Sequence, residues 1–225
     1  MEDVLTKARA QIVNELISHV IRAHQKFLSL DQTPLLKAAQ VIHDAFIREN
    51  KLLLFGNGGS ASDAQHVAAE FVGRFMRDRN ALPAIALTAD TSVVTAVAND
   101  YGYEHVFARQ IEALGRAGDV VIGISTSGES SNVLAAFKVA TQRGLTCIGL
   151  TGLDGGVIGQ AADIHIVAPD DSVPCVQELH RTILHIICQL VEQDQEPREI
   201  GSTEWLYTEF VEACGFRSPV RPFSK

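Results

Sequence analysis

The stretch Leu52-Leu53-Leu54-Phe55-Gly56-Asn57-Gly58-Gly59-Ser60 decides which fold we expect of this chain. Its first half is a short apolar run that ends at a glycine, which is typical of a fully buried strand, and helical periodicity follows it. Glycines allow positive φ and a close approach to a ligand, and a helix that begins near Ser60 directs free N–H groups into the space above the strand. The stretch therefore predicts a site for an anionic or polyhydroxylated ligand.

The helix after this stretch has an apolar side and a polar side. Residues three or four apart form each side; the apolar set is Ala64, Val67, Ala68, Phe71 and Phe75, and the polar set is Asp63, His66, Glu70 and Arg74. His66 and Glu70 thus project together. Such a pair can hold a divalent metal or can be an ordinary hydrogen-bonded pair, and the helix alone favours the ordinary pair.

Further strand-like runs follow, and helical segments separate most of them. They cover residues 84–87, 120–125, 145–150 and 164–167. This βαβα order predicts an α/β fold of three layers, αβα, in which helices cover both faces of a parallel sheet of about five strands. Ligands of such open sheets bind beyond the carboxyl ends of the strands.

A second polar loop follows residues 120–125 and leads into a helix. Its sequence is Ser125-Thr126-Ser127-Gly128-Glu129-Ser130-Ser131. Several hydroxyls at a helix N-terminus can bind a phosphate without a lysine, whereas a capped turn needs only one hydroxyl. Because this loop supplies a cluster of hydroxyls, we favour phosphate binding over a simple cap.

Two other segments supply polar side chains that are weak signals by themselves. Asn99 and Asp100 either face a sugar hydroxyl or form an Asx turn. A last core helix is expected over residues 176–192, and it carries polar side chains away from its apolar side, at Gln177, His180 and His185. A histidine in such a helix is more often a packed, hydrogen-bonded residue than a ligand.

A long helix is expected at the N-terminus, over residues 3–28. Apolar residues form two seams along it, one from Leu5 to Phe27 and one from Val13 to Leu28. A stripe this wide favours a helix shared between subunits, with packing wholly inside the chain as the alternative. Thr33 is expected to cap a second helix, with Pro34 at its first helical position.

Length and composition restrict the classes of protein. The 225 residues suit one domain, expected over residues 1–194, and a tail over 195–225 in which residues 202–213 suit a short helix. The net charge of −8 argues against a nucleic-acid partner. No apolar run approaches the roughly 18 residues of a membrane span, and Met1-Glu2-Asp3 lacks the basic start of a signal peptide. We therefore expect a cytoplasmic protein without a membrane partner, and the four cysteines, which form no C-x-x-C pair, as core thiols of a reducing compartment.

With these segments collected, the sequence resembles the SIS (sugar isomerase) domain family, and within it the sedoheptulose-7-phosphate isomerases. The resemblance covers about residues 5–194. It rests on Gly56-Asn57-Gly58-Gly59-Ser60, Ala64-Gln65-His66-x3-Glu70-x3-Arg74, Ala98-Asn99-Asp100-x-Gly102, Gly123-Ile124-Ser125-Thr126-Ser127-Gly128-x-Ser130, Leu150-Thr151-Gly152-x-Asp154-Gly155-Gly156 and Gln177-Glu178-x-His180-x4-His185.

The resemblance implies a zinc-dependent homotetramer with active sites between subunits. It implies four zinc ligands, at His66, Glu70, Gln177 and His185, and assigns Glu70 and His185 to proton transfer. It also implies sugar-phosphate binding by Asn57, Gly58, Gly59, Glu70, Asn99, Asp100, Ser125, Thr126, Ser127, Ser130 and Gln177. Where the family has Arg-Ile-Gln-Glu, this chain has Cys175-Val176-Gln177-Glu178, so a polar contact near the sugar is absent.

The spacing of two implied ligands adds a constraint. Gln177 and His185 are eight residues apart, about 12 Å along a regular helix, whereas zinc ligands lie about 2 Å from the metal. Either the helix begins after Gln177 or the two residues come from different chains, and His180 is the alternative ligand.

The reaction implied by the resemblance interconverts sedoheptulose 7-phosphate and D-glycero-D-manno-heptose 7-phosphate, the first step of nucleotide-activated heptose biosynthesis. A base and an acid move a proton through an enediol, and a metal can stabilise the developing oxyanion. The alternatives are an isomerase of another sugar phosphate and a non-catalytic SIS adaptor that resembles the DnaA initiator-associating protein, whose pattern lacks the residues that match Glu70 and His185. A phosphosugar-sensing regulator would need a helix-turn-helix domain, for which the chain has no room.

Overall fold

The computed structural model describes residues 2–195 of the chain, with side chains from residue 5 onward. Along these residues the elements are α1 (Glu2–Leu28), α2 (Thr33–Ile47), β1 (Leu52–Gly56), α3 (Gly59–Val72), β2 (Ala84–Ala86), α4 (Thr91–Tyr101), a 3-10 turn η1 (Tyr103–His105), α5 (Ala108–Leu114), β3 (Val120–Ser125), α6 (Ser131–Gln142), β4 (Thr146–Gly152), α7 (Gly156–Ala161), β5 (Ile164–Ala168) and α8 (Val173–Gln193). The helix suggested over residues 202–213, and Cys214, lie outside the described residues.

The five strands form one parallel sheet in the order β2-β1-β3-β4-β5, which confirms the predicted fold class. The chain builds β2 on one side of β1 and then crosses to build β3 on the other side. The strand order therefore reverses between β1 and β3, where Gly56 pairs with Ile124. In open α/β sheets this switch point is where ligands bind, beyond the carboxyl ends of the strands.

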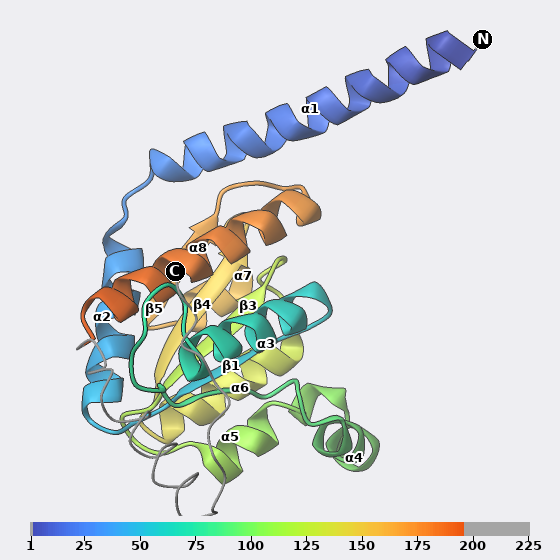
Figure 1. The fold of residues 1–225 in the computed structure, drawn as a ribbon. Helices are drawn as coiled ribbons and strands as arrows, with labels where there is room; N and C mark the ends of the chain where they lie inside the picture. The colour runs from blue at the N-terminus through green and yellow to red at the C-terminus, as the bar shows by residue number, and fades with distance from the viewer. Residues whose placement is uncertain (1, 196–225) are drawn as a thin grey trace, which may run out of the picture.

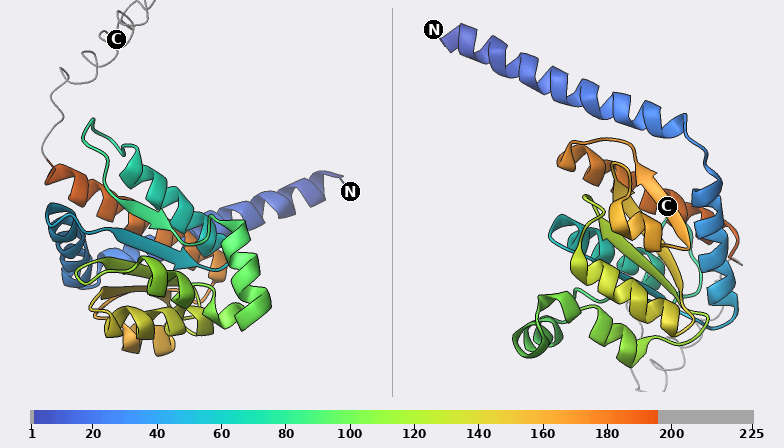
Figure 2. Two further views of the ribbon diagram at one scale, coloured as in Figure 1. Left: turned by 90° about the horizontal axis from the view of Figure 1, so that it is seen from below. Right: turned by 180° about the vertical axis from the view of Figure 1, so that it is seen from behind.

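Helices cover both faces of the sheet, as Figures 1 and 2 show. α2, α3 and α8 pack on one face against alternate strand residues such as Leu52 and Leu54. α5, α6 and α7 pack on the other face, where Leu53 and Phe55 point. Because both faces are buried, all five residues of β1 are apolar or glycine and all five are buried, which is the pattern that parallel strands require.

Helix α1 extends away from the rest of the molecule (Figure 1). The helix packs on the body from His19 onward: Ala23 and Phe27 are buried, and His24 Nε2 lies 3.1 Å from Thr182 Oγ1 of α8. Apolar side chains of both predicted seams are more than half exposed, at Leu5, Ile12, Val13, Leu16, Ile17, Ile21 and Leu28. Packing of both seams inside the chain is therefore wrong.

The predicted cap of α2 is one residue late. The helix already begins at Thr33, and the side chain of Asp31 accepts hydrogen bonds from Thr33 N at 3.0 Å and from Thr33 Oγ1 at 2.7 Å. Asp31 therefore fixes the turn that enters α2, and Pro34 is the second helical residue, one position later than predicted, where its missing N–H is still tolerated.

Candidate active site

The glycine loop after β1 is tightly packed. A Cβ on Gly56 would lie 2.7 Å from the carbonyl oxygen of Ile124, and Gly58 has φ of 57°. The carboxamides of Asn57 and Asn132 exchange two hydrogen bonds, at 2.9 and 2.8 Å. The hydroxyl of Tyr103 also donates to Asn57 Oδ1, at 3.3 Å. The side chain of Asn57 is thus held in one orientation at the switch point, because its carboxamide bonds to Asn132 of α6 and to Tyr103 of η1.

The serine loop after β3 gathers its hydroxyls. Ser125 Oγ lies 2.9 Å from Ser130 Oγ and 3.5 Å from Ser127 Oγ, and Ser127 Oγ accepts from the amide of Glu129 at 3.2 Å. Ser130 is the N-cap residue of α6, yet its side chain makes no capping hydrogen bond. The simple-cap interpretation is therefore wrong, because the hydroxyls face one another at the start of α6 and do not close the helix end.

The two loops form a single polar region. Asn132 belongs to the first turn of α6, directly after the serine loop, and its bond to Asn57 joins this turn to the glycine loop. Asn132 is 3% exposed. Sequence reasoning missed Asn132 and Tyr103 because the signal is a spatial pairing: neither residue lies in a pattern that distinguishes it from an ordinary helix or turn residue.

Asn99 and Asp100 lie in the last turn of α4, so the predicted Asx turn is wrong. Both are exposed, and Asn99 Nδ2 donates to Asp100 Oδ1 at 2.8 Å. The helix ends where Gly102 takes φ of 94°, and Tyr103 then reaches Asn57. Asn99 and Asp100 thus precede the residue that touches the glycine loop, while no hydrogen bond in residues 2–195 links them to either polar loop.

A second cluster lies between α3 and α8. His66 Nε2 is 2.8 Å from His185 Nε2 and 3.5 Å from Glu70 Oε1. Burial lowers the pKa of His185, and the adjacent His66 lowers it further. A neutral imidazole is the form that binds a metal, so this shift suits the ligand role of His185. The structure therefore brings three of the four predicted zinc ligands together.

Gln177 is the predicted ligand that lies apart. α8 begins at Val173, so the alternative in which the helix begins after Gln177 is wrong. The side chain lies against the start of α3: a Cβ built on Gly59 would fall 1.6 Å from Gln177 Nε2. His66 is seven residues farther along α3, about 10 Å along the axis. With Ser62 and Arg181, Gly59 and Gln177 line a groove of about 420 Å³.

The donors of the second cluster fit zinc. Two imidazole nitrogens and a carboxylate are typical zinc ligands, and the two nitrogens need to separate by only about 0.5 Å to take tetrahedral positions on one ion. Within one chain the carboxamide of Gln177 does not complete this set. The remaining position is therefore open to water, to substrate or to a group from another chain.

The carboxylate of Glu192 fixes the end of α3 relative to α8. It is 1% exposed and accepts backbone N–H bonds from Phe75, Met76 and Arg77, at 3.0, 2.8 and 2.9 Å. The buried guanidinium of Arg79 lies 3.4 Å from it and donates to backbone carbonyls at the end of α3. This buried network holds the end of α3, which carries Glu70, against α8, which carries His185.

Two polar residues of these helices are buried, against expectation. Asp63 was expected on the polar side of α3 but is 0% exposed, and Arg181 donates to its Oδ1 at 2.6 and 3.1 Å. His180 is also 0% exposed, and its ring nitrogens have no hydrogen-bond partner of good geometry among the described residues. Burial lowers the pKa of His180 to about 4, against smaller opposing effects of Thr151 and Asp63. His180 is therefore a neutral core residue, and its expected place away from the apolar side is wrong.

The fold and the site together define the class: an open α/β protein with a polar ligand site at the switch point between β1 and β3. The model of the SIS domain family matches residues 16–152. Phosphoheptose isomerases of Roseiflexus sp. and Geotalea daltonii are each 54% identical to this chain, over 163 and 183 residues, or 72% and 80% of it and 83% and 95% of the relatives. The solved phosphoheptose isomerase of Neisseria gonorrhoeae is 42% identical and superposes with a TM-score of 0.78 over 82% of this chain and 98% of that one.

The chain belongs to the SIS domain family and, within it, to the phosphoheptose isomerases, which makes it an aldose–ketose isomerase. The resemblance found in the sequence is thereby confirmed. Across residues 2–195 we find no helix with the length and apolar character that a bilayer crossing requires.

Proposed function

We propose that this protein interconverts sedoheptulose 7-phosphate and D-glycero-D-manno-heptose 7-phosphate. The observation that carries the proposal is the meeting of His66, Glu70 and His185 between α3 and α8, in a chain whose switch point holds two polar loops. The names of the relatives support the same substrate class.

Glu70 is the proposed base and His185 the proposed acid. The carboxylate of Glu70 removes the proton next to the carbonyl carbon, which gives the enediol, and His185 returns a proton to the neighbouring carbon. His66 lies between them and orients both side chains. The proposed cofactor is zinc, held by His66, Glu70 and His185 with Gln177, and when bound it stabilises negative charge on the substrate oxygens.

The serine loop is the proposed phosphate site. Its hydroxyls converge on the start of α6, where the helix end favours an anion, and the overall charge of −8 offers no general attraction for one. Asn57, Gly58 and Gly59 of the glycine loop, with Asn99 and Asp100, are the proposed contacts to the sugar hydroxyls.

A homotetramer with shared active sites is the proposed assembly. Glu70 follows Gly59 by eleven residues of α3, which is about 16 Å along the axis. The two polar loops of one chain are therefore well separated from the proton-transfer cluster, which is His66, Glu70 and His185. The exposed apolar face of α1 offers a surface for other subunits. In such an assembly the polar loops of one subunit approach the proton-transfer cluster of another. Gln177, which lies beside the glycine loop, then reaches that cluster from the same subunit as the loops. We place the enzyme in the cytoplasm, which agrees with its three buried free thiols.

An assay of the full chain with zinc and sedoheptulose 7-phosphate tests the function, with chromatography of the phosphosugars as the readout. We expect the aldose product with the wild type and a loss of at least about 100-fold with Glu70→Gln, because general base catalysis contributes about 10²–10⁴-fold. Other ketose phosphates assayed in parallel distinguish an isomerase of another sugar. No product from any of them would favour the adaptor.

A further inference from the structure

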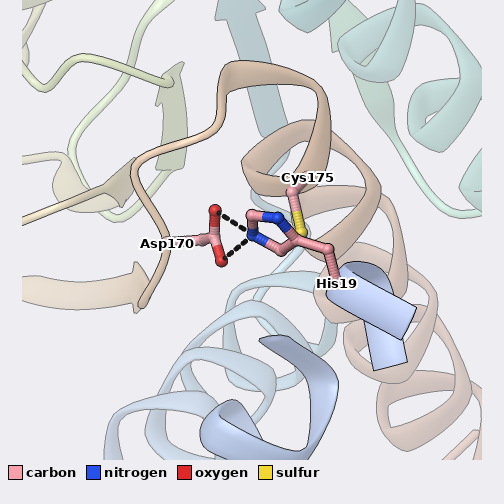
Figure 3. A group of neighbouring side chains, drawn as sticks. All are labelled: His19, Asp170 and Cys175. Atoms are coloured by element: carbon pink, nitrogen blue, oxygen red, sulfur yellow. Dashed lines mark hydrogen bonds and ion pairs between the residues drawn. The ribbon is translucent and has the colours of Figure 1, made fainter. Parts of the chain in front are cut away.

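Three potential metal ligands meet where α1 joins the body of the molecule. They are His19 of α1, Asp170 in the segment after β5, and Cys175 of α8 (Figure 3). One ligand atom from each, an imidazole nitrogen, a carboxylate oxygen and a thiol sulfur, lies within 4.8 Å of the other two. Among the described residues, no other three side chains of histidine, cysteine, aspartate or glutamate bring their ligand atoms this close together. Neither the proposed reaction nor the predicted zinc ligands include these three residues.

The geometry of the group is already close to a metal site. Asp170 faces the imidazole of His19 with both oxygens, at 2.9 and 3.1 Å from Nε2, and its Oδ1 also accepts from the amide of Ser172 at 2.9 Å. Tetrahedral zinc with ligands at about 2.0–2.3 Å keeps them about 3.3–3.7 Å apart, so His19 and Asp170 need to separate by only about 0.3 Å and the pairs with Cys175 to approach by at most about 1.5 Å. The bond from the Ser172 amide holds the carboxylate in place at the start of α8.

One side of the group is open. His19 and Asp170 form part of the wall of a cavity of about 750 Å³, which Arg22, Lys26, Asp154 and Asp171 also line. Cys175 is 4% exposed, and its sulfur lies next to the imidazole of His19, on the side away from Asp170 (Figure 3). Three protein ligands on one side and a cavity on the other leave a fourth position for water or for a second carboxylate. The cationic and anionic side chains of the wall balance, so they do not exclude a cation.

We propose that His19, Asp170 and Cys175 bind a divalent transition metal of the zinc class, separate from the proton-transfer cluster. The thiolate and imidazole select such a metal over magnesium or calcium, which prefer oxygen ligands. The metal joins α1 to the end of β5 and the start of α8. His19 is the first partly buried residue of α1, so the bond fixes the direction in which the exposed part of the helix leaves the body.

Cobalt(II) titration of the metal-stripped full chain tests this proposal. A cobalt–thiolate bond absorbs strongly in the near ultraviolet, and the His66, Glu70, Gln177 and His185 set contains no thiol, so metal bound to that set does not produce the band. We expect the band in the wild type, complete by about two equivalents because the proposed zinc ligands also take cobalt, and we expect it to vanish in Cys175→Ala and to remain in Cys147→Ala, a control that removes another buried thiol.

A second variant guards against misfolding. The side chain of His19 is 40% exposed, so His19→Ala spares the core and should weaken cobalt binding by at least about tenfold. Absence of the band in the wild type, or its persistence in Cys175→Ala, would overturn the proposal. Neither result bears on the isomerase activity, which is measured separately.

Discussion

Single residues decide how the site is held together, and their burial matters more than their type. Asp63 and His66 lie three residues apart on α3, yet Asp63 is fully buried against Arg181 while His66 remains partly exposed beside Glu70. His180 and His185 differ in the same way on α8. Position relative to the neighbouring helix therefore separates a structural charge or histidine from a reactive one.

The buried His180 predicts a loss of stability in acid. Its pKa is about 4 in the folded chain and about 6.5 when unfolded, so the unfolded state binds more protons between these values. The free energy of unfolding should fall as pH decreases from about 6.5 to 4, by on the order of 3 kcal/mol in total from this group. Urea unfolding at a series of pH values with a chelator measures this. The dependence should be shallower in His180→Leu, and equal curves for both proteins would contradict the assignment.

Gly59 predicts a steric test of the role of Gln177. In Gly59→Ala the new Cβ would meet the carboxamide of Gln177, which must then move away from the start of α3. Displacing a positioning group by about 1 Å costs up to about 100-fold, so we expect kcat/KM to fall by about 10- to 100-fold. Ser62→Ala, which changes an exposed residue of the same groove, is the control. Unchanged kinetics in Gly59→Ala would show that the position of Gln177 is unimportant.

At the scale of elements, two helix starts and one helix pair build the site. The starts of α3 and α6 meet because β1 and β3 are neighbours in the sheet, and the Asn57–Asn132 pair joins them. α3 and α8 run side by side, and Glu192 fixes their ends by accepting three backbone N–H bonds. The loops and the proton-transfer cluster are therefore positioned by different contacts.

The start of α6 predicts where the phosphate binds. Ser127→Ala and Ser130→Ala should each raise the KM for the sugar phosphate, because a hydrogen bond to a charged group contributes about 1.5–3 kcal/mol. Thr95→Ala is the control, since its hydroxyl donates within α4 to Thr91 O at 2.6 Å. Steady-state kinetics measures the effect. A KM that stays constant in both serine variants would place the phosphate elsewhere.

At the scale of the molecule, α1 is the feature that a single chain leaves unexplained. Its exposed apolar side chains face solvent over most of the helix, which is uncommon for a surface that has no partner. The distance along α3 between the polar loops and the proton-transfer cluster also indicates that the site is shared between subunits. Both features are accounted for by an assembly in which one chain's loops serve another chain's cluster.

Mixed assemblies test this division. Glu70→Gln subunits mixed with Ser127→Ala/Ser130→Ala subunits should regain activity, up to about one quarter of wild type if chains pair at random. Glu70→Gln mixed with His185→Ala should regain none, because both residues adjoin His66 of the same chain. Native mass spectrometry confirms mixing. Equal recovery in both mixtures, or none in either, would contradict a site shared between loops and cluster.

The sequence by itself determined the α/β class, the parallel sheet and the two polar loops, because hydrophobic runs and glycine or serine clusters are local signals. The division into residues 1–194 and a tail stays a prediction. Tertiary structure alone decided that β1 and β3 are neighbours, that Asn57 pairs with Asn132, and that His66 meets His185 across 119 residues. It also buried Asp63 and His180 and brought His19 to Asp170 and Cys175. These are contacts between distant segments, and a local pattern contains no information about which helix packs against which.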